Sequence, residues 1–183
     1  MSFILIRTIL WTAALCVLAG ASIVDLRRRI IPNEACIFVA VTGIALNVIA
    51  RSGGAWTTVA LSLLIFVALA IAAQLAIVGG GDAKMIAAVS LLVPPQGLAA
   101  LILAIALAGG GLSVVYLGLR SWLRATQPRR PSRHGAVARF LRRERARILA
   151  SSTVPYALAI FAGVVAYVMS ELSQCSSVTS CLL

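Results

Sequence analysis

Charged residues are grouped along this chain of 183 residues, and long uncharged runs separate the groups. The uncharged runs cover residues 8–24, 35–50, 52–81, 85–119 and 148–170. A helix that crosses a bilayer needs about 20 apolar residues, with a range of roughly 17–25. The third and fifth runs each hold one such helix, and the first two reach that length with their flanking residues. This pattern predicts helices that cross a membrane.

The run over residues 85–119 is too long for one helix, and it contains Pro94 and Pro95, which cannot continue a helix. We predict a short helix over about residues 83–93, followed by a full span over about residues 97–119. Eleven residues rise only ~16 Å, about half of the hydrocarbon thickness. The predicted fold class is therefore all-α: a polytopic membrane protein with six transmembrane helices, the fourth short, in a single domain over residues 1–183.

Composition supports this prediction, because 61% of the residues are hydrophobic, 11% are charged and the mean hydropathy is +1.04. A soluble domain carries about 25% charged residues. These values exclude a water-soluble enzyme, a disordered tail and a nucleic-acid-binding module. The isolated polar residues Asn47, Gln74 and Ser90 fall inside predicted spans, where hydrogen bonds between helices explain them.

The distribution of the basic residues predicts the orientation in the membrane. Arg27–Arg29 follow the first helix and outweigh Arg7, which favours an outside amino terminus and disfavours a cleaved signal peptide. Six helices then bring the Arg triplet, Lys84 and residues 120–147 to the cytoplasmic side, with 14 of the 16 basic residues. We therefore predict a multi-pass protein of the bacterial inner (cytoplasmic) membrane, with both termini in the periplasm.

Residues 120–150 form the predicted basic cytoplasmic loop. Its second part, residues 136–150, has apolar residues near one helical face and arginines elsewhere. Such a helix beside a membrane lies on anionic lipid headgroups, so we expect membrane lipids as partners there. Nucleic acid is not an expected partner, because the membrane topology already explains the basic residues.

The four cysteines divide into two pairs. Cys175 and Cys181 lie in the predicted periplasmic tail, where oxidising conditions permit a disulfide between them. Cys16 and Cys36 lie in or beside membrane segments and are expected to act as small apolar side chains. No cysteine spacing indicates a zinc site, and no metal is predicted.

Asp25 and Asp82 are the only aspartates in the chain, and each lies at the end of a predicted helix. A carboxylate at membrane depth is costly, which makes it a functional candidate by default. The predicted topology brings both to the cytoplasmic boundary. Two carboxyl groups within a few Å share one proton, so one can take a proton from water while the other activates a peptide carbonyl. Asp25 and Asp82 are therefore the predicted catalytic pair of an aspartic protease.

The neighbours of the two aspartates fit such a site. The three glycines before Asp82 permit close approach of a substrate strand, a Pro-Asn pair after Asp25 supplies a rigid turn and helix entry, and a lysine adds positive charge. The predicted substrate-binding or site-supporting residues are Gly79, Gly80, Gly81, Lys84, Pro32 and Asn33.

Each aspartate also has a structural explanation. Asp25 could pair with the arginines that follow it, and Asp82 could be an acidic residue favoured by the dipole at a helix start. A third alternative makes the protein a small proton-coupled transporter or channel that uses Asp25 and Asp82 as a relay. A relay should place its acids near the membrane midplane, whereas both aspartates are predicted at one boundary.

Two stretches carry a family resemblance. Asp25-Leu-Arg-Arg-Arg-Ile-Ile-Pro-Asn33 and Gly79-Gly-Gly-Asp-Ala-Lys84 resemble the two signatures of the type IV prepilin peptidases, membrane aspartic proteases of the G-x-G-D type. Residues 154–160 are similar to the last-helix pattern of that family. The likeness extends from Asp25 to the sixth helix.

The resemblance implies an aspartic endopeptidase that removes the leader peptide of type IV prepilins. It implies cleavage at the cytoplasmic membrane face, after a glycine that precedes the hydrophobic segment of the pilin, with Asp25 and Asp82 as the catalytic pair and without a cofactor. The chain lacks the cysteine-rich amino-terminal insert of the long bifunctional members, so the resemblance implies the peptidase activity and leaves N-methylation open. This compact form resembles the peptidases of tight-adherence (Flp) pilus systems, which makes a Flp-like prepilin the expected substrate and partner.

Overall fold

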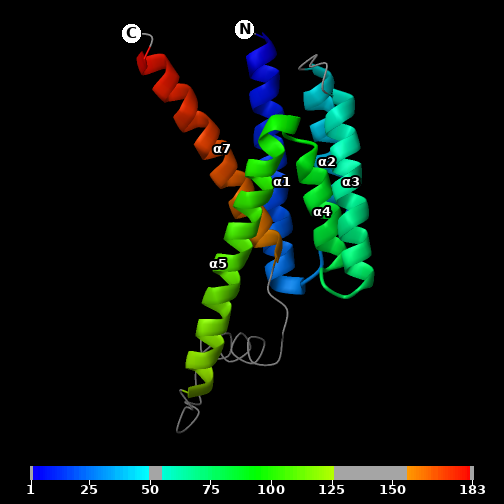
Figure 1. Cartoon of the computed structure of the whole chain (residues 1–183), viewed down its shortest axis with the longest axis vertical. Coiled ribbons are helices and arrows are strands. Elements are labelled where there is room, and N and C mark those ends of the chain that lie inside the picture. Colours follow the sequence, from blue (N-terminus) through cyan, green and yellow to red (C-terminus); the bar gives the residue numbers. More distant parts are fainter. Residues whose placement is uncertain (1, 50–54, 126–155, 182–183) are drawn as a thin grey trace. The chain divides into compact units, whose positions relative to one another are not determined.

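The computed structural model describes residues 2–49, 55–125 and 156–181 (Figure 1). Within these residues the chain is almost entirely helical. The helices are α1 (Ser2–Arg28), α2 (Asn33–Ile49), α3 (Ala55–Gln74), α4 (Gly80–Ser90), the 3-10 turn η1 (Pro95–Gly97), α5 (Leu98–Ala125) and α7 (Tyr156–Cys181). Short turns join α1 to α2, α3 to α4 and α4 to α5. Six α-helices with a short fourth helix confirm the predicted all-α fold class.

Four of these helices are long and apolar enough to cross a membrane. Their candidate spans are Leu5–Arg28, Ala55–Gln74, Pro95–Trp122 and Tyr156–Ser173. Helix α2 is apolar but shorter, with 17 residues, and α4 has 11. The length and composition of the helices confirm a membrane protein.

The proline pair separates α4 from α5, as predicted. Helix α4 ends at Ser90, and η1 begins at Pro95 and leads directly into α5. The short helix begins about three residues earlier than predicted, because Gly79 is its extended N-cap and the next two glycines adopt helical geometry. Helix α5 continues beyond the predicted end to Ala125, so the first part of the predicted basic loop is helical.

Two helices end in residues with left-handed backbone geometry, and both precede a predicted site motif. Arg29, after α1, has a φ of 56°, and Ala76, after α3, has a φ of 57°. At the end of α3, the N–H of Ile77 donates to the carbonyl of Ala72 at 3.0 Å, which closes the helix in a Schellman-type turn. These two turns redirect the chain into the segments that carry Pro32 and the three glycines.

The chain divides into two compact units, Met1–Ala108 with Pro155–Leu183, and Gly109–Val154. In the first unit, α4 packs against α2 and α3 and also contacts α7, while α1 packs against α2 and α7. The turn between α1 and α2 and the turn between α3 and α4 lie at the same end of this unit (Figure 1). The two aspartate-bearing segments therefore meet at one end of the helical bundle.

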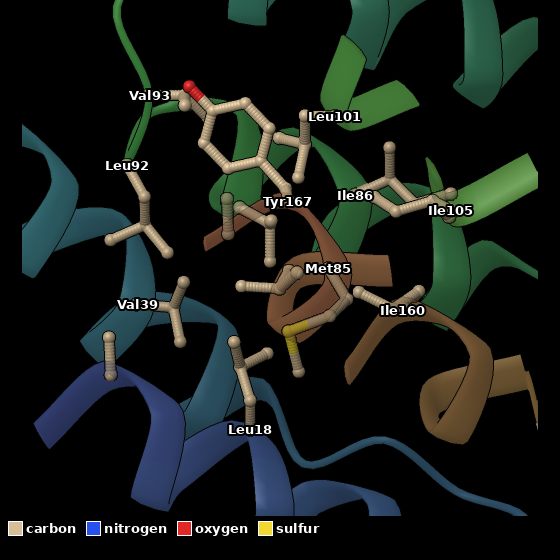
Figure 2. Packing of buried hydrophobic residues seen from close by; sticks show 14 of the residues in the cluster. Leu18, Val39, Met85, Ile86, Leu92, Val93, Leu101, Ile105, Ile160 and Tyr167 are labelled. Atoms are coloured by element: carbon tan, nitrogen blue, oxygen red, sulfur yellow. The ribbon is translucent and has the colours of Figure 1, made fainter. Parts of the chain in front are cut away.

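The core of the first unit fixes the position of α4. Met85 of α4 is fully buried and lies among Leu18 of α1, Val39 of α2 and Ile160 of α7 (Figure 2). Interiors are close-packed, so the side chains of this cluster prevent α4 from rotating about its axis. Asp82 lies three residues before Met85, on the same face of α4, and is oriented by the same packing.

A second contact fixes the far end of α4 on α2. A Cβ added at Gly43 would lie 2.7 Å from the backbone carbon of Leu91, so only glycine permits this approach. Next to it, Nδ2 of Asn47 donates to the carbonyl of Leu91 at 2.7 Å. This bond confirms the predicted interhelical role of Asn47. Ser90, in contrast, bonds within its own helix, to the carbonyl of Ile86.

Two predictions concern parts of the chain beyond this core. The amphipathic helix over residues 136–150 lies outside the described residues. Helix α7 remains helical through Cys175 and Cys181. Six residues rise about 9 Å in a helix, whereas a disulfide needs Cα atoms within about 7 Å. The disulfide therefore requires the end of α7 to unwind, and it stays a prediction.

Candidate active site

Asp25 lies in the last turn of α1 and is almost entirely buried, with 6% of its surface exposed. Its Oδ2 accepts a hydrogen bond of 3.1 Å from the backbone N–H of Ala157, in the first turn of α7. Ser22 Oγ lies 3.0 Å from the carbonyl oxygen of the same residue. The first N–H groups of a helix lack partners within that helix, so a carboxylate from α1 satisfies one of them here. These contacts fix the start of α7 to the end of α1.

Asp82 lies in the first turn of α4 and is half-buried. It is close enough to Asp25 for the charge of Asp25 to act on it. Burial, and secondly the charge of Asp25, raise the pKa of the Asp82 carboxyl from 3.8 to about 6. The structure therefore brings the two predicted aspartates within electrostatic range of each other, and Asp82 holds its proton up to a higher pH than an ordinary aspartate does.

The three glycines before Asp82 have different surroundings. A Cβ added at Gly79 would lie only 2.6 Å from Oδ2 of Asp82, so a side chain there would displace the carboxyl group. A Cβ at Gly81 would meet the side chain of Ile31 at 3.4 Å, and one at Gly80 would meet nothing within 4 Å. The absence of a side chain at Gly79 thus creates the space that the Asp82 carboxyl occupies.

Lys84 and Asn33 lie close together on the other side of α4. Nζ of Lys84 donates to Oδ1 of Asn33 at 3.3 Å. Residues two positions apart on a helix are separated by about 200° around its axis, so Lys84 and Asp82 lie on nearly opposite faces. Pro32 serves α2 instead, because its carbonyl accepts the N–H of Cys36 in the first turn. The contacts described for Lys84, Asn33 and Pro32 therefore lie away from the two aspartates.

One residue near the two aspartates is not among the predicted site residues. Tyr156, the first residue of α7, is half-buried and lies within electrostatic range of Asp82. Because the N–H of Ala157 binds Asp25, the first turn of α7 lies beside both aspartates. The only signal in the sequence is the Val-Pro-Tyr stretch at residues 154–156, of which residues 154 and 155 lie outside the described residues.

A bundle of apolar helices that brings one buried and one half-buried carboxyl group together at one end is the arrangement of a membrane protein with a pair of acidic residues. A family model, the type IV leader peptidase family, matches residues 12–114, more than half of the chain and including both aspartates. The chain belongs to this family, and it is a peptidase. No curated protein and no solved structure matches it.

Proposed function

We propose that the protein is an aspartic endopeptidase that removes the leader peptide of Flp-like type IV prepilins at the cytoplasmic membrane face. Family membership supports the leader-peptidase activity in general. The observation that carries the catalytic assignment is the electrostatic contact between Asp25 and Asp82 at one end of the bundle. The basic residues that flank this end favour its location on the cytoplasmic side, with both termini in the periplasm.

The surroundings of the two aspartates assign them different roles. The Ala157 N–H donates to Asp25, which suits a carboxylate that accepts a proton. Among the described residues no N–H donates to the Asp82 carboxyl, and its pKa is raised, so Asp82 holds the proton that the pair shares. In the first step Asp25 takes a proton from water, the hydroxide attacks the scissile carbonyl carbon, and Asp82 gives its proton to the carbonyl oxygen.

The tetrahedral intermediate then collapses. Asp25 gives its newly acquired proton to the amide nitrogen, the C–N bond breaks, and a hydroxyl proton of the intermediate returns to Asp82. The products are the carboxyl end of the leader and the amino end of the mature pilin. One water is consumed, and the pair of aspartates regains its single shared proton.

The direct test is co-expression with a Flp-type prepilin, followed by gel analysis of leader removal. Separate Asp25→Asn and Asp82→Asn variants are each expected to lose at least ~1,000-fold of the cleavage rate, because the acid-base machinery then lacks one partner. Glu34→Gln is the matched control, since Glu34 is an exposed carboxylate in the first turn of α2 at the same end of the unit. Full cleavage by either aspartate variant would refute the catalytic pair.

Reporter fusions test the proposed orientation in the membrane. A reporter that is active only in the periplasm should be inactive when fused after Gly135, in the basic segment, and active when fused at the carboxyl terminus. Activity of the first fusion would overturn the cytoplasmic location of the site without affecting the assignment of the aspartates.

A further inference from the structure

A groove of about 540 Å³ opens between α2 and α3, with α4 as its floor. It lies on the face of α4 that carries Lys84, and thus on the opposite side of this helix from Asp82. Lys84 and Asn33 lie at its cytoplasmic end, and Ile44 and Leu91 lie seven or more residues further along their helices. The groove therefore extends at least about 10 Å from the level of the aspartates into the apolar part of the bundle.

The floor and the walls of the groove differ in the size of their side chains. The floor contains Ala87 and Ala88 of α4, whereas the walls carry Ile37, Leu63 and Phe66. In a membrane, small residues let the backbone of another helix approach closely, and larger ones at the sides increase the packing area. This profile suits a helix, one side of which enters the groove.

A buried hydroxyl group gives independent evidence for a ligand. Ser62 of α3 lines the groove and is 4% exposed, and within the described part of the chain its Oγ has no hydrogen-bond partner. A buried polar group without a partner costs about 1–3 kcal/mol. Ser62 lies 12 residues before the end of α3 at Gln74, about 18 Å along the helix. At that depth the acyl chain of a lipid has no hydrogen-bond acceptor. A backbone carbonyl of a bound helix has a second lone pair, which can accept a hydrogen bond from the Ser62 hydroxyl.

A path leads from the aspartates to the groove. Gly79, Gly80 and Gly81 are exposed at the start of α4, between the face that carries Asp82 and the face that carries Lys84. A helix is about 10 Å wide, and an extended strand covers ~3.3 Å per residue. Three or four extended residues of a substrate can thus cross this surface, which carries no side chains, from Asp82 to Lys84.

We propose that this groove holds the hydrophobic segment of the prepilin substrate as a transmembrane helix, while the residues next to the cleavage site cross the three glycines to the aspartates. The inference rests on the proposed function, because it names the binding site for the substrate of that reaction. The groove determines affinity and the aspartates perform the chemistry, so changes on the two faces of α4 should affect different kinetic constants.

Photo-crosslinking tests where the substrate lies. A benzoylphenylalanine replaces Phe66 in the groove or, as the matched control, Phe38, which lies on α2 outside it; their exposed fractions are 37% and 44%. Both are placed in Asp82→Asn protein so that the prepilin stays intact. We expect an adduct from position 66 within about the first ten residues of the hydrophobic segment, because Phe66 lies eight residues from the end of α3.

The same experiment distinguishes other occupants. Equal adducts from both positions, or a phospholipid adduct at position 66 that excess prepilin does not reduce, would overturn the proposal. Neither result affects the proposed function, which is tested separately by leader removal in the wild-type protein. If the wild-type protein removes no leader, the proposed function fails, and the groove proposal fails with it.

Kinetics supply a second test. Ala87→Leu fills the floor and is expected to raise KM for the prepilin about tenfold with kcat unchanged. Ser62→Ala removes the hydrogen-bond donor and is expected to raise KM about fivefold without loss of stability. Ala68→Leu, an exposed position of α3 outside the groove, is the control that should change neither constant. An unchanged KM in both groove variants would refute the proposal.

Discussion

The ends of α1 and α4 each present one aspartate to the same site, but the protein holds these side chains by opposite means. Asp25 belongs to a long helix, is buried, and is held by a hydrogen bond from the start of α7. Asp82 belongs to a short helix, and its carboxyl occupies space that a missing side chain at Gly79 leaves open. A hydrogen bond positions Asp25, whereas the lack of a side chain at Gly79 leaves room for the Asp82 carboxyl. Substitutions beside the two aspartates should therefore have different effects.

The largest expected difference concerns the glycines beside Asp82. Gly79→Ala places a methyl group against the Asp82 carboxyl and is expected to lower kcat/KM about 100-fold, because a misplacement of about 1 Å at a catalytic group has that effect. Gly20→Ala, in α1, is the control, because an added Cβ there meets nothing within 4 Å, and it should retain nearly wild-type activity. Leader removal at several substrate concentrations measures both. Equal activity of the two variants would show that the space at Gly79 does not position Asp82.

The next difference concerns stability. Asp25→Ala leaves the buried N–H of Ala157 without its acceptor, and we expect it to lower the free energy of unfolding by about 1–3 kcal/mol. Asp82→Ala removes a carboxyl group that is costly to bury when charged, so it should not destabilise the protein at neutral pH. Reversible unfolding in detergent micelles compares them. A larger loss in the Asp82 variant would contradict the structural asymmetry of the pair.

The raised pKa of Asp82 predicts how this comparison depends on pH. A raised pKa in the folded protein means that folding favours the protonated carboxyl; this stabilisation is complete below pH 3.8 and is lost as the pH rises through about 6. Asp82→Asn has no carboxyl to titrate at this position, so its Tm relative to the wild-type protein should rise between about pH 4 and about pH 6 and stay level at higher pH. A Tm difference that stays constant with pH would show that folding leaves the Asp82 carboxyl unperturbed.

The smallest expected effect concerns the turn before the three glycines. Ala76 has left-handed backbone geometry, which costs a residue with a side chain about 1 kcal/mol relative to glycine. Ala76→Gly should therefore stabilise the protein by up to ~1 kcal/mol, whereas Ala73→Gly, in the last turn of α3, should destabilise it by about the same amount. Unfolding in the same micelles measures both variants, and an identical sign would contradict the assigned turn.

The six α-helices of the described residues, the short fourth helix and the placement of one aspartate at each of two helix ends can all be predicted from the chain alone. These features follow from local properties: uncharged length, the proline pair and the grouping of basic residues. The same local reasoning placed Asn47 between helices, but it assigned Lys84 and Asn33 to the surroundings of the aspartates.

Which helix faces meet depends on long-range packing, which the local pattern of residues does not show. The start of α7 lies more than 130 residues after Asp25 in the chain, and no local pattern predicts that Ala157 binds that carboxylate or that Tyr156 approaches Asp82. The groove likewise depends on how far α2 and α3 separate over α4, which packing at Gly43 and Met85 controls. Helical periodicity shows which residues share a face, whereas long-range packing selects the neighbour of that face.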